Sequence, residues 1–442
     1  MTITNDILLQ QFFEISLWEE ALKHGLEKHL NYSILRELCN VDVRADLYRA
    51  IRDGRYHVLP PRAVLVPKDV KGEYRTVYIN EDADRVILHI ANNLLMDTMS
   101  EMIHPSCLSY RRGIGCGKIA NELARYCRDQ KEDVIGWKAD LSKYFDSVPI
   151  EIIDGVFDAM EHKCGRSALI SMIREYYHSD EYIDPKGEKC QRYLSLRQGC
   201  SVSSFLANVV LKEVDELLSG MTGKYVRYSD DMIFVGPDYK QALRLLEERV
   251  ASLGLSLNAS KLQLLRKGEW FNFLGFSLRD GLVSLSPRRI KSFQREIEKR
   301  SIKQRQITLT QALRRVQQYM YIGDGEYSWA TNVLPYINCR KDIDTLNGFV
   351  QDCLRAVATG NRRIGGLGFD RFGEQGCICR GRGRNVKGNK ATYGSPIDSY
   401  MTIGCMKNAL GYSHEVYEAL VRNIKGCCAH NNGDVKRIIS NR

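Results

Sequence analysis

The tetrapeptide Tyr228-Ser229-Asp230-Asp231 constrains the fold of this chain more than any other segment. It joins two short runs, KYVRY and MIFVG, whose apolar residues predict the two arms of a β-hairpin. The adjacent carboxylates at its tip repel each other, and a divalent cation that neutralises them makes the arrangement favourable. A solvated turn is the alternative interpretation, because Ser and Asp are common in hairpin turns.

A third acid, Asp140, closes the apolar run VIGWKAD, which predicts a strand over 134–140. If this strand lies beside the hairpin, Asp140 and Asp230 converge, with Asp231 next to them. Such a group of acids suits two Mg²⁺ ions, or Mn²⁺ in their place, roughly 3.5–4 Å apart, the geometry for in-line phosphoryl transfer. The sequence therefore predicts a two-metal site at one end of a sheet.

Composition limits the classes of function. The 64 Lys and Arg residues exceed the 54 Asp and Glu residues by ten, which fits a polyanionic partner such as nucleic acid without requiring one. No run of 18 apolar residues is present, so we expect no membrane-spanning segment and no membrane partner. The first residues are acidic where a signal peptide is basic, which predicts a cytoplasmic protein with mostly reduced cysteines.

Hydrophobic spacing predicts an α+β fold with mixed order of strands and helices. Gly254 is expected to end the helix before it as a left-handed cap. The predicted helices cover 18–30, 32–38, 45–51, 84–99, 150–160, a stretch after Gly199, 239–253 and much of 287–361. The predicted strands cover 63–67, 75–79, 134–140, 225–228, 232–235, the neighbourhood of 262–265, and 271–278.

Five motifs occur in one order along about 140 residues, and this order resembles the palm motifs of reverse transcriptases. They are Asp140-Leu-Ser-Lys-Tyr-Phe-Asp-Ser-Val148, then Gln198-Gly199 with Ser203 and Asn208, then Tyr228-Ser-Asp-Asp231, then Gly254-Leu-Ser-Leu-Asn258 with Lys261, and Phe273-Leu-Gly-Phe276. Upstream, Pro67-Lys68 with Arg75 and Ser109-Tyr-Arg-Arg-Gly113 resemble the fingers of bacterial reverse transcriptases.

The resemblance implies a right-hand polymerase that uses deoxynucleoside triphosphates to make cDNA on an RNA template. It divides the chain into a helical N-terminal extension (1–44), fingers (45–135), palm (136–285), helical thumb (286–360) and a basic extension rich in Gly and Cys (361–442). By overall similarity, the chain is closest to the defence-associated reverse transcriptases of bacteria, the unknown groups, which are related to retron and group II intron enzymes.

The resemblance also implies roles for single residues. Asp140, Asp230 and Asp231, with the backbone carbonyl of Leu141, would hold the metal ions, and Lys261 would protonate the leaving pyrophosphate as a general acid. The incoming nucleotide would be bound by Lys68, Arg75, Phe145, Gln198 and Gly199, and the primer and template by Tyr228, Phe273, Leu274, Gly275, Arg288 and Arg289. The Phe145 ring would exclude ribonucleotides by a clash at the 2′ position, so DNA is the expected product.

The C-terminal cysteines carry no strong metal signature. Their C-x-C and C-C spacings lack the paired C-x₂-C of zinc sites, so reduced thiols are favoured over zinc. The basic thumb and C-terminal extension suit RNA binding. The resemblance implies that the RNA is a structured noncoding RNA, copied as template in antiphage defence. The alternatives are a retron or group II intron enzyme, a template-independent terminal transferase, and a non-catalytic RNA-binding maturase.

Overall fold

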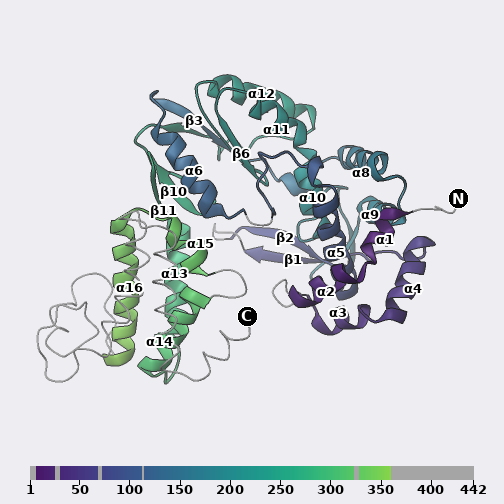
Figure 1. Ribbon diagram of the computed structural model, residues 1–442, viewed down its shortest axis with the longest axis horizontal. Helices are drawn as coiled ribbons and strands as arrows, with labels where there is room; N and C mark the ends of the chain where they lie inside the picture. The colour runs from purple at the N-terminus through teal and green to yellow at the C-terminus, as the bar shows by residue number, and fades with distance from the viewer. Residues whose placement is uncertain (1–5, 25–29, 68–71, 112–113, 323–327, 360–442) are drawn as a thin grey trace, which may run out of the picture. The chain divides into compact units, whose positions relative to one another are not determined.

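The computed structural model describes residues 6–24, 30–67, 72–111, 114–322 and 328–359 (Figure 1). The described residues form two compact units: those within 1–113 and 132–266, and those within 114–131 and 267–359. Lys68, the predicted C-terminal extension and its cysteines lie outside the described residues. The five-part division predicted from the sequence stays a prediction, and each unit is described by itself below.

The central sheet of the first unit has the strand order β6-β7-β3-β8 and is antiparallel throughout. Its strands are β3 (Val134–Ala139), β6 (Lys224–Tyr228), β7 (Asp231–Val235) and β8 (Gln263–Arg266). Helices α11 (Lys212–Ser219) and α12 (Tyr239–Ser252) pack against it (Figure 1). Gly254 follows α12 with a φ of +69°, which confirms the predicted left-handed cap.

The core of this unit is built around α10 (Val202–Val210), in which every residue except Ser204 is buried. A helix that is apolar on all sides belongs in the interior, and α10 packs against α5 (Asp82–Thr98) and α8 (Ile150–Cys164). The other helices of the unit are α1 (Ile7–Phe12), α2 (Ile15–His24), α3 (Tyr32–Leu38), α4 (Val41–Arg52), η1 (Ser100–Met102), α7 (Tyr144–Ser147) and α9 (Ala168–His178).

A second sheet in the first unit has the order β2-β1-β4-β5. The predicted hairpin over 63–67 and 75–79 is confirmed as β1 (Arg62–Pro67) and β2 (Tyr74–Ile79), which pair antiparallel. The short strands β4 (Glu181–Ile183) and β5 (Lys189–Gln191) extend it. This second hairpin was not predicted, because three-residue strands are too short to show a period of two.

The second unit combines a small sheet with helices (Figure 1). The sheet has the order β11-β10-β9, and α6 (Cys116–Arg128) packs on β10 and β11. Its strands are β9 (Phe271–Phe273), β10 (Phe276–Arg279) and β11 (Leu282–Leu285). The remaining helices are α13 (Pro287–Arg300), α14 (Leu309–Gln317), the π-helical turn η2 (Gln318–Ile322), α15 (Trp329–Asn332), η3 (Leu334–Tyr336) and α16 (Arg340–Thr359).

Candidate active site

The register of the central sheet places two acids at neighbouring strand ends, on the same side of the sheet. Strand β3 ends at Ala139, which pairs with Met232 of β7, so Asp140 emerges beside the start of β7. Tyr228 pairs with Asp231, which leaves Ser229 and Asp230 as a two-residue hairpin loop at the same edge. The sequence predicted this hairpin and this neighbouring strand, and the structure confirms both elements.

The carboxyl groups of Asp140 and Asp230 face each other closely enough to share a hydrogen bond. Burial, the negative charge of Asp140 and that of Asp231 raise the pKa of Asp230 from 3.8 to about 6. Asp140 is only 3% exposed. Two carboxylates held together in this way are unfavourable on their own, and their oxygen donors and shared negative charge fit a divalent cation.

Asp231 has a lysine partner on the neighbouring strand. Its carboxylate lies 3.4 Å from the ammonium group of Lys138 on β3. Among the residues that the structure describes, no three His, Cys, Asp or Glu side chains are grouped so that they could hold one metal ion. The geometry therefore brings Asp140 and Asp230 together and gives Asp231 a lysine partner, and the predicted three-acid metal site stays a prediction.

Lys261 reaches the site because its loop is bound to the loop after β3. Asn258 donates its backbone N–H to the carbonyl of Asp140 at 2.8 Å, and Leu141 forms an isolated β-bridge with Leu257. The Lys261 ammonium group then pairs with the Asp140 carboxylate. Burial disfavours the charged amine, but the hydrogen bond and the charge of Asp140 raise the pKa of Lys261 above its ordinary value.

Phe145 lies five residues beyond Asp140, at the start of α7. Its side chain is half-buried against the core, and its backbone carbonyl accepts a hydrogen bond from Ser195 Oγ at 3.0 Å. The neighbouring Tyr144 is buried and donates its hydroxyl to the carbonyl of Ala207 at 2.7 Å. These two bonds fix one end of the segment, and the bond from the Asn258 N–H to the Asp140 carbonyl fixes the other.

Gln198 and Gly199 pack against strand β2. The carbonyl of Gln198 accepts a hydrogen bond from the Tyr78 N–H at 2.7 Å, and Gly199 has a φ of +109°. A Cβ atom on Gly199 would lie 2.5 Å from the Tyr78 carbonyl oxygen, so only glycine fits here. Arg75, on the same strand, has a buried Nε atom without a hydrogen-bond partner among the described residues.

About half of the chain matches a known protein family. Residues 66–278 match the family described as reverse transcriptase (RNA-dependent DNA polymerase). The chain contains a reverse transcriptase domain. This span holds Asp140, Asp230 and Lys261, and the α+β fold predicted for a right-hand polymerase is confirmed.

Individual relatives are distant. The putative COX1/OXI3 intron 1 protein of Saccharomyces cerevisiae is 22% identical over 172 residues, which are 39% of this chain and 20% of that protein. Telomerase from Candida albicans, in complex with a telomeric RNA fragment, has a TM-score of 0.45 at 12% identity and covers 87% of this chain and 64% of its own. A partial Cas6-RT-Cas1–Cas2 complex has a TM-score of 0.34 at 18% identity, over 57% and 42% of the two chains. The chain thus spans less than two thirds of each of these relatives.

The residues predicted to bind primer and template fall in both units. Tyr228 ends β6 of the reverse transcriptase domain, and its ring centroid lies 6.3 Å from that of Tyr110. The second unit holds Phe273, Leu274, Gly275, Arg288 and Arg289. Leu274 and Gly275, with φ angles of +51° and +80°, form the turn between β9 and β10, and the Arg289 guanidinium lies 4.7 Å over the Phe276 ring.

The sequence interpretation assigned no role of their own to several residues near the site, although it quoted some of them within motifs. Tyr110 is 49% exposed and its ring lies beside that of Tyr228, and Lys138 pairs with Asp231. The Arg192 guanidinium lies 4.5 Å over the Tyr78 ring and 3.7 Å from the Asp146 carboxylate. The position of Arg227 could have been noticed in the sequence. A charged residue within a strand that is expected to be buried is rare without a partner, so it predicts a buried ion pair. Within the described residues, no helix has the length and apolar character needed to cross a membrane.

Proposed function

We propose that this protein is an RNA-dependent DNA polymerase that extends a 3′-hydroxyl with deoxynucleotides. The observation that carries the proposal is the close pair of Asp140 and Asp230 at adjacent strand ends, inside the reverse transcriptase match. Paired carboxylates that are unfavourable without a cation are what metal-assisted phosphoryl transfer requires. The order of the flanking motifs supports the proposal, because it resembles the order of the palm motifs in reverse transcriptases.

In this proposal Asp140 and Asp230 hold the metal, with the Leu141 carbonyl as a further ligand and Asp231 as the third acid. Bound Mg²⁺ or Mn²⁺ ions would activate the 3′-hydroxyl and stabilise charge on the triphosphate. Lys261 would move its proton to the leaving pyrophosphate, and its raised pKa keeps the amine protonated at neutral pH for that transfer.

The remaining roles are those that the resemblance to reverse transcriptases implies. Arg75 and Lys68 would bind the triphosphate, and Gln198 with Gly199 would lie beside the new base pair. Phe145 would close against the sugar and select deoxynucleotides. In the second unit, the basic start of α13 with Arg288 and Arg289 would bind the phosphate backbone of primer and template. In this proposal the fingers, palm, thumb and terminal extensions are assigned the boundaries that the resemblance implies.

The biological setting is part of the proposal. By its resemblance to defence-associated bacterial enzymes, the protein would copy a structured noncoding RNA into cDNA during antiphage defence in the cytoplasm. A retron or group II intron enzyme is the nearest alternative, and a non-catalytic maturase is the alternative of another class. Sequencing of RNA and DNA that co-purify with the protein from its native locus separates these cases, because each predicts a different template and product.

A primer-extension assay tests the activity. The wild-type protein, Asp230→Asn and Phe145→Ala would each receive an RNA template, a DNA primer, Mg²⁺ and either deoxynucleotides or ribonucleotides. We expect synthesis by the wild type, none by Asp230→Asn, and a rise of about 10–10²-fold in ribonucleotide use relative to deoxynucleotide use by Phe145→Ala.

Asp158→Asn serves as the matched control, because Asp158 is a surface aspartate that pairs with Arg174. It removes the same charge as Asp230→Asn and should leave synthesis unchanged. Undiminished synthesis by Asp230→Asn would overturn the assignment of the acids. RNA binding by the wild type without synthesis would favour the maturase.

A further inference from the structure

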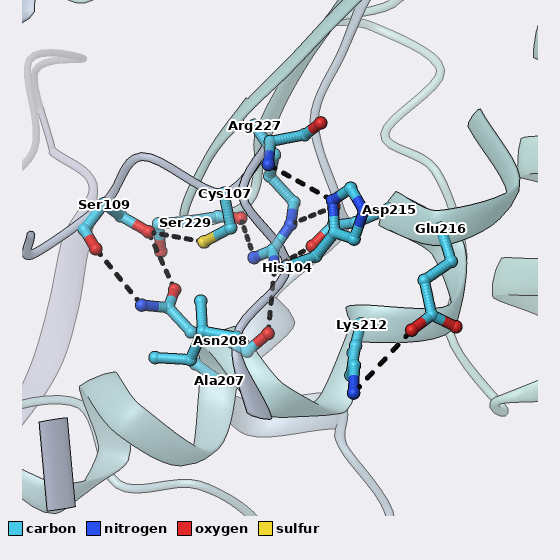
Figure 2. Close-up of polar contacts among 12 residues, drawn as sticks. His104, Cys107, Ser109, Ala207, Asn208, Lys212, Asp215, Glu216, Arg227 and Ser229 are labelled. Carbon is cyan, nitrogen blue, oxygen red and sulfur yellow. Dashed lines mark hydrogen bonds and ion pairs between the residues drawn. The ribbon is translucent and has the colours of Figure 1, made fainter. Parts of the chain in front are cut away.

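A buried ion pair lies directly behind the hairpin that carries Asp230. Arg227 on β6 and Asp215 on α11 are both fully buried. Arg227 Nε donates to Asp215 Oδ1 at 2.7 Å and Nη2 donates to Oδ2 at 2.6 Å, a two-bond fork (Figure 2). Burial opposes the charge of Arg227, but Asp215 more than compensates and raises the pKa of the guanidinium, so the pair stays ionised.

Two further N–H groups of the guanidinium donate to backbone carbonyls. Nη1 donates to the carbonyl of Ser229 at 3.1 Å, and Nη2 donates to the carbonyl of Asn208 at 2.9 Å. The Ser229 carbonyl belongs to the peptide group whose N–H is that of Asp230. Ser229 also has a φ of +58°, which costs a residue with a Cβ roughly 1–2 kcal/mol and persists only where the surroundings fix it. Arg227 supplies such a constraint.

The same helix end also fixes the segment of the other acid. At the C-terminal turn of α10, the Asn208 carbonyl accepts from Arg227 and the Ala207 carbonyl accepts from Tyr144, four residues after Asp140. Asn208 adds a side-chain link, because its Oδ1 accepts from Ser109 Oγ at 2.7 Å and its Nδ2 donates to the Ser109 carbonyl at 3.2 Å (Figure 2). Both acidic segments are therefore hydrogen-bonded, through Tyr144 and Arg227, to the same end of α10.

We propose that Arg227, held by Asp215, is a positioning residue that fixes the Ser229 peptide and thereby sets the Asp230 carboxylate against Asp140. This proposal rests on the proposed polymerase function. Arg227 touches neither the nucleotide nor the metal in this role. It acts through the peptide that joins Ser229 to Asp230, and its effect falls on the rate of the chemical step more than on substrate binding.

A purely structural ion pair is the competing account, and three variants separate it from positioning. Arg227→Lys keeps a positive charge for Asp215, but one ammonium group cannot replace the fork and also reach the Ser229 and Asn208 carbonyls. Arg227→Met with Asp215→Leu removes both charges, a change that buried pairs often tolerate. Tyr225→Phe is the matched control, since the Tyr225 hydroxyl donates to Asp215 Oδ1 at 3.0 Å without a bond to Ser229.

The measurements are kcat and KM for deoxynucleotide on a primed RNA, thermal unfolding, and hydrogen exchange of the peptide over 225–235. For Arg227→Lys and for the double variant we expect a fall in kcat of about 10–10²-fold, KM within twofold of the wild type, and faster exchange at residues 229–231. Tyr225→Phe should lower the unfolding temperature and keep the wild-type kcat and exchange.

The outcomes are distinguishable. If a folded Arg227→Lys or double variant keeps the wild-type kcat and exchange, Arg227 is only structural and the positioning proposal is wrong. If Arg227→Lys fails to fold, the double variant decides. If the wild type makes no DNA on any primed RNA, the polymerase function fails instead, and hydrogen exchange alone still shows whether Arg227 fixes the Asp230 peptide.

Discussion

Two clusters of buried charge flank Ser229 and differ in how they are balanced. On one side, Asp140 and Asp230 bring two negative groups together, and the pKa of Asp230 rises to about 6. On the other side, Arg227 and Asp215 form a pair of opposite charges in which the arginine donates to four acceptors. The cluster assigned to chemistry is unfavourable in the isolated protein, and the cluster behind it is satisfied. In the proposed function, the cluster that would bind cations keeps an excess of negative charge, because Lys261 balances only one of its two carboxylates, whereas Arg227 and Asp215 balance each other.

The largest expected difference between the clusters is in activity. Asp230→Asn keeps the size of the side chain and removes the charge that a metal would bind. We expect DNA synthesis to fall by at least about 10²-fold, because electrostatic groups at the reacting centre contribute at least that much. Primer extension in Mg²⁺ measures it. A comparable fall in Asp158→Asn would show that surface charge, and not the site, controls the rate.

The next effect is on stability at the balanced cluster. Asp215→Asn leaves the buried Arg227 without its counter-charge, and breaking a buried pair costs about 3–5 kcal/mol. Urea unfolding at pH 7 should show this loss in the free energy of unfolding of the first unit. An unchanged midpoint would mean that water or another acid compensates Arg227 in solution.

At the cluster of Asp140 and Asp230, an Asp→Asn substitution should have the opposite effect and raise the free energy of unfolding. The pKa of Asp230 is higher in the folded protein than the 3.8 of an exposed aspartate, so ionisation of Asp230 destabilises the fold as the pH rises from about 4 to about 6, and the loss is complete above that range. Without metal at pH 8, Asp230→Asn should therefore raise the free energy of unfolding by on the order of 1–3 kcal/mol.

This gain should shrink as the pH falls through 6 and vanish below about 4, where wild-type Asp230 is protonated in both states. Unfolding curves in a chelating buffer between pH 4 and 8 measure the trend. A gain that is equal at both ends of this range would show that repulsion between Asp140 and Asp230 is not its source.

The smallest effect concerns the residue between the clusters. Ser229→Gly keeps the carbonyl that Arg227 binds and relieves the positive φ of a residue with a Cβ. We expect a change of less than about 1 kcal/mol in stability, with synthesis retained, because strain relief and the greater freedom of the unfolded glycine oppose each other. Thermal unfolding with primer extension checks both. A large loss of activity would show that the serine hydroxyl has a role of its own.

The sequence predicted the parts of this site that depend on local pattern. Apolar alternation placed the hairpin around Asp230 and the strand before Asp140, and both lie in one sheet. The contact between Lys261 and Asp140 was not predicted, because it depends on the bridge between Leu141 and Leu257, which are far apart in the chain. Arg227 was quoted only as part of a strand, since nothing local shows that its partner is Asp215 on another element. Pairings between distant elements carry no periodic signal, and tertiary packing alone reveals them.

The end of α10 has a consequence for how this chain tolerates changes in length. Successive carbonyls of Ala207 and Asn208 bind the two acidic segments, one through Tyr144 of α7 and one through Arg227 of β6. Each residue of a helix turns by about 100°, so one residue inserted or deleted within 202–206 would rotate both acceptors away from their donors together. Insertions in the exposed turn near Gly187 meet no such restriction. Variation in length among natural or engineered versions of this protein should therefore occur in surface turns and not in α10.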